Sequence, residues 1–546
     1  MGNELSFLPV PVPKGTAAEK QLVPPPALLV DGAQHKISYQ LLLRAGQVLG
    51  SATFGRIMDE NGKPVPQSPE DGGEIISYAM GFSSIIPAQD GLRMLTNFSD
   101  LPGAIYQTRL SQSPDGTLAA VATQAMDLRA LRGIWQPGSG TVTPWQTHLA
   151  SERHSPDARS FEEAASADDV DNSVKEMGRY FGLDPDGASL EQLRAKINPY
   201  RYGFPVEMWF GKKGAPGPVR HYAMGRASPD ISIVMPDRRT VYISDDASNG
   251  GLYRFVADKP NDLRAGQLYA LGWQQQNEEF YGSATLDWID LGHADEAAIA
   301  KAIDGGIRFS DMFDAAPMSG SGGCPEGFGP SNAGERPECL RVKPGMEVLA
   351  SRLETRRLAS LLGAATELRA LNGMVFNPQR NSIYLAFGEV AKGMTNGGKQ
   401  DFGGRNFIRT RKNRCGAIFE MMLGEAFVAK TVRPIYYGTP EKADGKGCNI
   451  NNIANPGNLA YVPGRFLLLI ADAGDGHDNN FLWAVDIRKN QLIRILSAPA
   501  GASLGAVRLY PNLGGHGYVT VAAYDNKGKE KAASVGVLGP LPVLGP

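Results

Sequence analysis

The chain of 546 residues has little cysteine, no excess of charge and no long apolar run. Its formal net charge of -2 gives no support for a nucleic acid or an anionic membrane as partner. No stretch approaches the length of apolar residues that spans a bilayer, so we expect no membrane span. The chain also lacks a P-loop, a G-x-S-x-G elbow, an H-E-x-x-H motif and a dinucleotide fingerprint. The common signatures of nucleotide, serine-hydrolase, zinc-protease and NAD chemistry are therefore missing.

The four cysteines predict two disulfides. Cys324 and Cys339 bracket a loop rich in Gly, Pro and Ser, which gains most from a cross-link, and Cys415 and Cys448 form the second expected pair. The alternative is four buried thiols in a cytosolic protein, and neither pair has the spacing of a zinc ribbon. The start, Met1–Glu4, lacks the basic and apolar regions of a signal peptide. We expect a mature periplasmic or secreted form, with the export signal absent from this sequence.

A recurring pattern predicts an all-β fold. A Pro-containing tight turn is followed at once by a short run rich in Val, Ile and Tyr, which is typical of a strand. The pattern occurs five times, with its proline at Pro114, Pro236, Pro378, Pro463 and Pro511. One such unit cannot bury its own apolar face, so several must stack, which predicts a β-propeller of about six blades. The irregular period indicates insertions, where we expect the chemistry to lie.

We expect one decorated domain over residues 1–546, because no shift in composition marks a boundary. Helical periodicity predicts insertions at about 158–200 and 293–369. The first insertion contains a helix that starts at a capping box formed by Ser189 and Gln192. The second contains a longer helix over 346–363.

Two further expectations concern strands. The clearest hairpin covers residues 240–256, with Asn249-Gly250-Gly251 as a positive-φ turn. We also expect the C-terminal run 535–546 to supply a closing strand to the first blade.

Three segments carry candidate site residues. Residues 144–154 hold Glu152, His148, His154 and an arginine after an apolar strand, a mixture that suits Mn, Fe, Zn or Ca. The alternative is a strand end with a surface Glu–Arg pair.

The second segment runs from His221 to Asp230 and leads into the hairpin that carries Asp245 and Asp246. Arg226 and Asp230 would hold a phosphate oxygen and a cation, whereas the alternative is a set of ordinary turn acids. The third segment, 472–480, alternates oxygen side chains with glycines like half of a calcium loop, but it lacks the terminal Glu of an EF-hand and equally suits a plain acidic turn.

Taken in order, several phrases resemble the PhoX-type alkaline phosphatases, which are secreted β-propeller phosphoesterases that use iron and calcium. The resemblance covers most of the chain and is carried by these phrases: LSFLPVPVP, PWQTHLASE, NPYRYGFPVE, MGRASPD, TVYISDDASNGGLYRF, GQLYALGW, ATELRALNGMVFNPQRNSIYLAFGE and NPGNLAYVPG. It implies the propeller fold, a metal centre and a small-molecule phosphate ester as substrate.

The chain departs from that family where its metal ligands are expected. Ser151 stands where the family has a Cys before the retained Glu152, and Pro229-Asp230 replaces a His-Glu pair. Ala370-Leu371-Asn372 replaces Arg-Pro-Glu, and Pro456-Gly457-Asn458 replaces Pro-Asp-Asn. Losing carboxylates lowers the affinity for a multi-cation cluster, and losing the thiolate removes the soft ligand that favours iron.

The resemblance and the residues together predict a metal-dependent hydrolase of phosphate esters, in which a metal-activated water attacks phosphorus. We expect Glu152, Asp230 and Arg226 to be catalytic. The expected ligands of the metal, which is Ca, Fe, Mn or Zn, are Glu152, Asp230, His148, His154, His221, Asn372 and Asn458. The substrate is a mono-, di- or triester, and the sequence does not set the oligomeric state. The alternative is a non-catalytic propeller that binds a ligand at a degenerate metal site.

Overall fold

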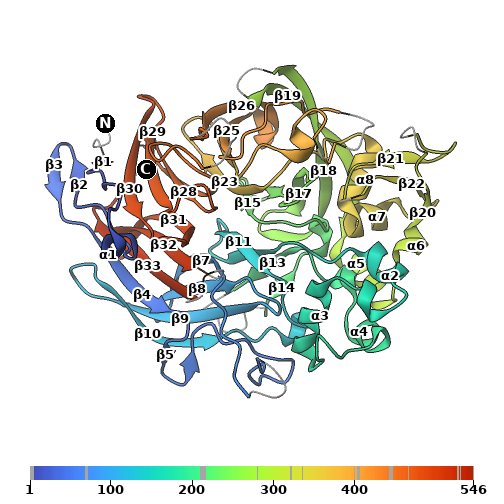
Figure 1. The fold of residues 1–546 in the computed structure, drawn as a ribbon, viewed down its shortest axis with the longest axis horizontal. Coiled ribbons are helices and arrows are strands. Elements are labelled where there is room, and N and C mark those ends of the chain that lie inside the picture. The colour runs from blue at the N-terminus through green and yellow to red at the C-terminus, as the bar shows by residue number, and fades with distance from the viewer. Residues whose placement is uncertain are drawn as a thin grey trace.

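The computed structural model describes residues 5–67, 72–209, 217–278, 281–319, 323–334, 336–398, 400–401, 406–441, 447–464, 466–525, 528 and 531–544. Antiparallel sheets are the main regular structure of these residues (Figure 1). No helix among them is long and apolar enough to cross a membrane. The start, Met1–Glu4, lies outside the described residues.

Six four-stranded blades surround a central axis (Figure 1). In order from the inside outward, blades 1 to 3 are β7 (Met80–Ala88), β8 (Gly91–Phe98), β9 (Ala104–Gln112) and β10 (Leu118–Ala125); β11 (Pro137–Val142), β12 (His148–Glu152), β13 (Pro205–Met208) and β14 (Val219–Arg220); and β15 (Ser232–Val234), β16 (Thr240–Ser244), β17 (Leu252–Lys259) and β18 (Asp262–Asn277). Blades 4 to 6 are β23 (Leu371–Asn377), β24 (Ser382–Phe387), β25 (Ala417–Leu423) and β26 (Ala429–Tyr437); β27 (Pro456–Val462), β28 (Leu467–Asp472), β29 (Phe481–Asp486) and β30 (Gln491–Ser497); and β31 (Ser503–Leu513), β32 (His516–Asp525), β33 (Ala532–Leu541) and β4 (Ser38–Arg44).

Each innermost strand contacts the innermost strands of the two neighbouring blades, in the order β7, β11, β15, β23, β27, β31 and back to β7. Because a blade is covered on both faces, a middle strand can be buried along its whole length, as β24 and β28 are. The extra strand β19 (Ser283–Asp295) joins blades 3 and 4 by pairing with both β18 and β26. The expected propeller of about six blades is confirmed.

The ring is closed by a strand from the N-terminal part of the chain. Strand β4 pairs with β33, with Leu43 opposite Val535, and so forms the outer strand of blade 6. The C-terminal strand β33 belongs to this last blade, so the expectation that it closes the first blade is wrong. Small sheets lie outside the ring: β1 (Leu5–Phe7), β2 (Leu28–Val30) and β3 (Ala33–His35); β5 (Val48–Leu49) and β6 (Ala52–Thr53); and β20 (Phe313–Ala316), β21 (Gly329–Ser331) and β22 (Glu338–Val342).

The proline turns have a regular place in this ring. Four of the five precede the second strand of a blade, namely β16, β24, β28 and β32, whereas Pro114 precedes β10. The hairpin of β16 and β17 forms as expected, but its turn differs. The segment 245–251 connects the strands, no residue of Asn249-Gly250-Gly251 has a positive φ, and the Asp245 carboxylate accepts hydrogen bonds from the Ser228 and Gly251 amides instead.

Helices lie in two insertions and near the N-terminus. They are α1 (Thr16–Glu19), then α2 (Ala158–Glu163), α3 (Asn172–Gly178) and α4 (Leu190–Lys196), and then α5 (Glu296–Asp304), α6 (Phe309–Met312), α7 (Glu347–Leu353) and α8 (Thr355–Leu362). Ser189 and Gln192 form the expected capping box at the start of α4. The longer helix expected over 346–363 is broken at Glu354, whose carboxylate accepts hydrogen bonds from Tyr200 and Arg357. The division into domains stays a prediction.

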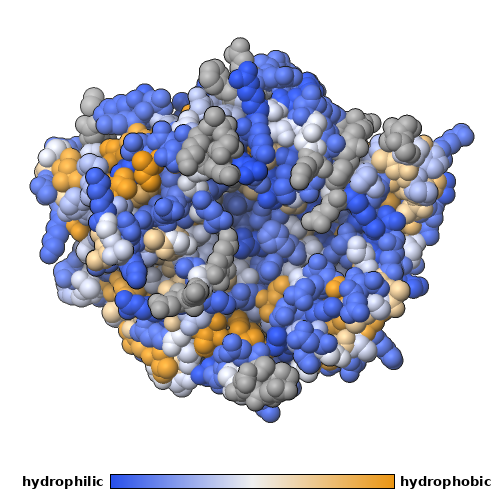
Figure 2. Space-filling model, in the orientation of Figure 1, coloured by the Kyte–Doolittle hydropathy of each residue, from blue (hydrophilic) through white to orange (hydrophobic). Residues whose placement is uncertain are grey.

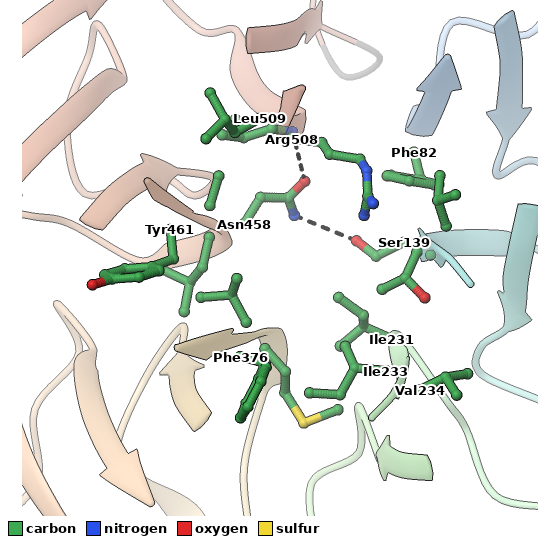
Figure 3. Close-up of a pocket in the computed structure, with 18 residues that line it drawn as sticks. Phe82, Ser139, Ile231, Ile233, Val234, Phe376, Asn458, Tyr461, Arg508 and Leu509 are labelled. Carbon is green, nitrogen blue, oxygen red and sulfur yellow. Dashed lines mark hydrogen bonds between the residues drawn. The ribbon is translucent and has the colours of Figure 1, made fainter. Parts of the chain in front are cut away.

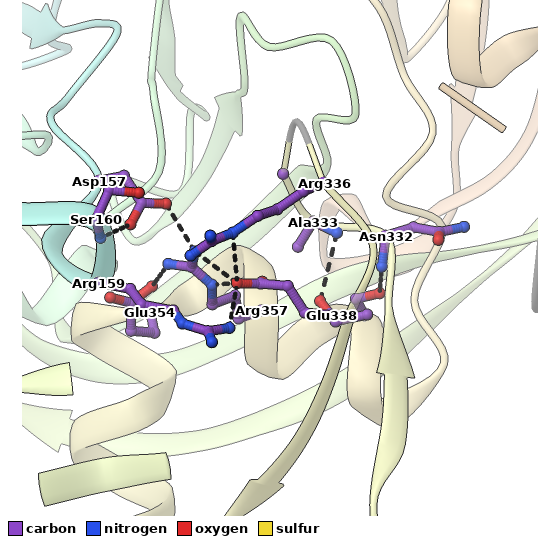
Figure 4. A network of polar contacts seen from close by, with 12 residues as sticks. Asp157, Arg159, Ser160, Asn332, Ala333, Arg336, Glu338, Glu354 and Arg357 are labelled. Carbon is purple, nitrogen blue, oxygen red and sulfur yellow. Dashed lines mark hydrogen bonds and ion pairs between the residues drawn. The ribbon is translucent and has the colours of Figure 1, made fainter. Parts of the chain in front are cut away.

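A buried ionic network holds the two insertions together (Figure 4). Arg357 on α8 contacts Asp157 at the start of α2, Glu338 on β22 and Glu354, at 2.6–2.8 Å. Arg159 on α2 reaches Glu338 at 2.9 Å. Both expected disulfides, Cys324–Cys339 and Cys415–Cys448, are present.

Candidate functional site at the mouth of the central channel

Polar residues gather where the innermost strands begin. Asp230 lies just before β15, Asn372 is the second residue of β23, and Asn458 is the third residue of β27. Because every blade starts with its innermost strand, these starts meet at one end of the central channel. The face in Figure 2 is hollowed near its centre, and hydrophilic residues surround the hollow. Three of the predicted site residues therefore come together at the channel.

Five side chains form what we call the mouth cluster: Arg153, His154, Asp230, Asp246 and Asn372. The Arg153 guanidinium lies 3.5 Å from Oδ1 of Asp230 and 4.0 Å from Oδ2 of Asp246. The Nε2 atom of His154 lies 3.4 Å from the same Asp246 oxygen, and half of the His154 side chain is exposed. The Asn372 amide nitrogen faces Oδ1 of Asp246 at 3.1 Å when the amide is oriented to satisfy both of its atoms. Two carboxylates therefore share one guanidinium.

The charge of Asp230 is perturbed by its surroundings. Burial raises the pKa of this carboxyl, Arg153 opposes the rise and Asp246 adds to it, so that the pKa settles at about 6. The Ser139 amide donates a hydrogen bond of 3.3 Å to Asp230, and the Ser139 hydroxyl accepts one of the same length from Asn458. A carboxyl with such a pKa exchanges protons near neutral pH, as a general acid or base must.

Glu152 does not face the channel mouth. Its buried carboxylate accepts five hydrogen bonds, two of them from Arg220 and three from the amides of Trp135, Gly203 and Phe204. The Arg220 pair is bidentate, at 2.6 and 2.9 Å, and both side chains are almost wholly buried. The structure gives Glu152 a place inside blade 2, and its expected role as metal ligand and catalyst stays a prediction that these contacts do not favour.

Three other predicted residues also lie away from the mouth. Burial lowers the pKa of His148 to about 3, and its ring nitrogens contact Ser84 and Asn97 at 2.7 and 2.9 Å. Burial alone would lower the pKa of His221, but hydrogen bonds to two glutamates, Glu207 and Glu296, outweigh it and raise the pKa to about 9.

Arg226 donates to the carbonyl oxygens of Pro156 and Tyr202 and lies over the ring of Tyr200.

In the acidic segment 472–480, Asp472 is buried against His477 and Trp483, at 3.1 and 2.8 Å. These contacts hold the fold together and leave the side chains turned away from solvent.

The residues present do not fit the multi-metal cluster that the resemblance implies. In the part of the chain that the structure describes, no three His, Cys, Asp or Glu side chains are arranged to hold a metal ion. Each candidate carboxylate already faces a guanidinium: Glu152 faces Arg220, and Asp230 and Asp246 face Arg153. Positive charge from arginine therefore compensates these acids.

Below the mouth, a cavity of about 250 Å³ lies on the axis (Figure 3). All six innermost strands or the residues next to them line it. Most of the lining side chains are apolar, with Ile231, Ile233 and Phe376 among them, but polar atoms form more than half of the cavity surface. Ser139, Asn458 and Arg508 add polar groups. The cavity adjoins the mouth cluster, because Ile231 follows Asp230 in the chain and Ser139 contacts both Asp230 and Asn458.

The sequence did not single out three of these residues as site residues. Arg153 stood beside Glu152 in a candidate segment, and Asp246 stood in the expected hairpin, but neither spacing showed that they meet. Arg508 had no signal in the sequence, because only the closed ring brings β31 beside β27.

Comparison with known proteins agrees with this fold. The family profile "Alkaline phosphatase PhoX" matches residues 105–486. Among solved structures, PhoX of Pseudomonas fluorescens in complex with vanadate, a transition state analogue, has a TM-score of 0.63 at 15% identity, with 98% of each chain covered. The β-propeller domain of Myceliophteria thermophila Cps50 (Swd1) has a TM-score of 0.33 at 8% identity, with 85% of this chain and 97% of that chain covered. A search of curated protein sequences gives no match. The profile covers well over half of the chain, which therefore belongs to the alkaline phosphatase PhoX family and, with it, to the phosphoric ester hydrolases.

Proposed function

We propose that this protein hydrolyses phosphate esters at the mouth of its central channel. The observation that carries the proposal is the mouth cluster, where a guanidinium, two carboxylates and an imidazole meet at the starts of the innermost strands. The PhoX protein of Pseudomonas fluorescens, which shares the fold, holds vanadate, a transition state analogue. That finding supports a phosphoryl-transfer site in this fold.

In this proposal Arg153 binds the phosphoryl oxygens. A guanidinium offers paired N–H donors to an oxyanion and stabilises charge that develops on it. Arg153 lies within 4.0 Å of both carboxylates and 30% of its side chain is exposed, so it is within reach of a substrate. It takes the role that the sequence suggested for Arg226.

Asp230 would move the proton. In its ionised form it accepts a proton from the water that attacks phosphorus, and in its neutral form it donates a proton to the leaving oxygen as the P–O bond breaks. Its pKa of about 6 makes both forms accessible near neutral pH. His154 lies at the rim, with its Nε2 atom 3.4 Å from Asp246, and would orient the ester.

Metal-activated water, with Ca, Fe, Mn or Zn, stays part of the sequence hypothesis, and the proposal above routes no step through it. The deciding experiment measures hydrolysis of p-nitrophenyl mono-, di- and triesters by chelator-treated protein, with and without each metal. We expect Asp230→Asn and Arg153→Gln to lower kcat/KM at least 100-fold, on the scale of one lost acid–base or oxyanion-stabilising group. Exposed Glu425 supplies the control, Glu425→Gln.

Absence of turnover on every ester, with and without metals, contradicts the proposal and favours the non-catalytic binding propeller. Turnover that depends on one metal and is lost in Asp230→Asn instead supports the metal hypothesis. Equal activity of Asp230→Asn and the native protein places the site elsewhere.

We further propose that the protein works in the periplasm or outside the cell. Two disulfides without a free cysteine among the described residues suit an oxidising compartment. Measuring activity and urea resistance after reduction tests this: a protein that depends on its disulfides loses resistance to urea, whereas an unchanged midpoint contradicts the proposal.

A further inference from the structure

Arg508 differs from the other arginines near the channel. Arg153, Arg220 and Arg356 each face a buried carboxylate, and Arg226 donates to two carbonyl oxygens. No ion pair joins Arg508 to a carboxylate anywhere in the described ranges. Its Nε atom, like that of Arg153, is buried without a hydrogen-bond partner. Arg508 is partly exposed, and taking a guanidinium partly out of water costs less when an anion compensates it.

The guanidinium of Arg508 points into the axial cavity. Figure 3 shows it in the space between Phe82 and Asn458, directed toward Ser139. The aliphatic part of Arg508 leaves β31, and its guanidinium also lies 5.5 Å from the ring centre of Tyr510. Ser139 on β11 and Asn458 on β27, which are joined by a hydrogen bond of 3.3 Å, supply a hydroxyl and an amide to the same cavity. One cation and two neutral polar groups therefore face a space whose other lining side chains are mostly apolar.

The size and lining of the cavity limit what it accepts. A volume of about 250 Å³ holds roughly eight water molecules at ~30 Å³ each, or a compact organic group with a similar number of heavy atoms. Its apolar side chains can pack against the hydrocarbon part of a substrate, and the guanidinium, which no carboxylate compensates, favours a negative group at one end. The cavity adjoins Asp230 through Ser139, so such a group would lie beside an ester bound at the mouth.

We propose that the axial cavity is the subsite for the organic part of the substrate, and that Arg508 recognises a second anionic group on that part. The substrate class is then a phosphate ester of a compact alcohol or phenol that carries a carboxylate or a second phosphate. This inference rests on the proposed function, because it places the reacting ester at the mouth cluster.

The test compares phenyl phosphate with 4-carboxyphenyl phosphate as substrates. For the native protein we expect kcat/KM to favour the carboxylated ester at least tenfold. Arg508→Gln removes that preference, Arg508→Lys keeps part of it, and Arg433→Gln, which changes an arginine with 59% of its side chain exposed on blade 4, leaves it as in the native protein. Equal preference in the native protein and Arg508→Gln overturns the inference, as does the absence of any preference in the native protein.

Calorimetric binding of phenylphosphonate and 4-carboxyphenylphosphonate, which cannot be hydrolysed, separates the two proposals. If no ester is turned over but the carboxylated phosphonate binds tenfold more tightly and only through Arg508, the subsite stands and the hydrolytic function fails. If both esters are hydrolysed and both phosphonates bind alike, the function stands and the subsite fails. The urea midpoint of Arg508→Gln without ligand is a further check: we expect it to equal or exceed that of the native protein, whereas a clear fall gives Arg508 a structural partner and overturns the inference.

Discussion

The substitution Glu152→Gln decides whether Glu152 stabilises the fold or takes part in the reaction. Its two carboxylate oxygens both accept from donors: Oε1 from the Trp135 amide and Arg220, and Oε2 from Gly203, Phe204 and Arg220. A glutamine of the same shape must turn its NH₂ group toward one of these two sets. Either orientation places a donor against at least two donors and leaves the buried guanidinium without its counter-ion.

The expected cost follows from the burial of the pair. Removing one partner of a buried, hydrogen-bonded ion pair costs about 3–5 kcal/mol, because the remaining charge stays uncompensated. The Glu152 and Arg220 side chains are 0% and 2% exposed, so water cannot substitute for the lost partner. We therefore expect Glu152→Gln to lower the free energy of unfolding by about that amount.

Asp230→Asn is the matched comparison. Burial raises the pKa of Asp230, which means that its ionised form is disfavoured in the folded protein, so a neutral asparagine should cost little stability while abolishing proton transfer. Urea unfolding followed by tryptophan fluorescence and kcat/KM for p-nitrophenyl phosphate are measured on both variants, with Glu425→Gln as control.

The reasoning is refuted if Glu152→Gln keeps the native urea midpoint and loses activity, because Glu152 would then act in the reaction and not in the fold. If the variant does not accumulate as soluble protein, pulse proteolysis of freshly purified material still measures the loss of stability. A native-like resistance in that assay contradicts the structural role equally well.

Three further predictions concern stability alone. The pKa of His221 is raised from 6.5 to about 9, so its stabilising contribution is complete below about pH 6.5 and is lost as the pH rises to 9. The free energy of unfolding, measured with urea, should therefore fall over this interval by on the order of 3 kcal/mol in the native protein and not in His221→Gln. Replacing Cys415 and Cys448 by serine opens a loop with a sequence separation of 33, and the chain-entropy relation predicts a loss of about 4 kcal/mol in the same assay, so an unchanged midpoint speaks against it. On the closing strand, Leu43→Ala should cost about 2–5 kcal/mol because Leu43 is wholly buried, whereas Leu41→Ala, at a position 37% exposed, should cost far less; equal losses would mean that β4 does not pack as described.

The repeated turns made the fold predictable, since most of them mark the step from the first to the second strand of a blade. The way the ring closes was not predictable, because residues 38–44 carry no proline turn and their partner strand lies some 490 residues away in sequence. Glu354 illustrates a smaller failure. Helical periodicity runs through it, but the helix breaks there, where the Glu354 carboxylate accepts from the distant Tyr200 as well as from the nearby Arg357.

The candidate site was predictable only in part. Asp230, Asn372 and Asn458 stand at positions that the resemblance to the PhoX family marks, and the structure brings them together because the starts of the innermost strands meet. His148 and His221 lie close to the candidate motifs in sequence. Closeness along the chain does not decide which side chains reach the channel, because alternate residues of a strand such as β12 face opposite sides. Which acids are already neutralised by arginine depends on contacts between blades, and a single sequence does not show them.

The borrowed strand of blade 6 sets the order in which the molecule can be completed. Until the ribosome has made Ala532–Leu541, the early strand Ser38–Arg44 has no strand partner. Its backbone amides and carbonyls, and those on the facing edge of β32, are then unpaired. A chain that stops before Ala532 therefore lacks strand β33 and also the β33–β4 pairing that connects its C-terminal and N-terminal parts. Circular permutants cut between blades should tolerate new termini better if the cut leaves this joint continuous.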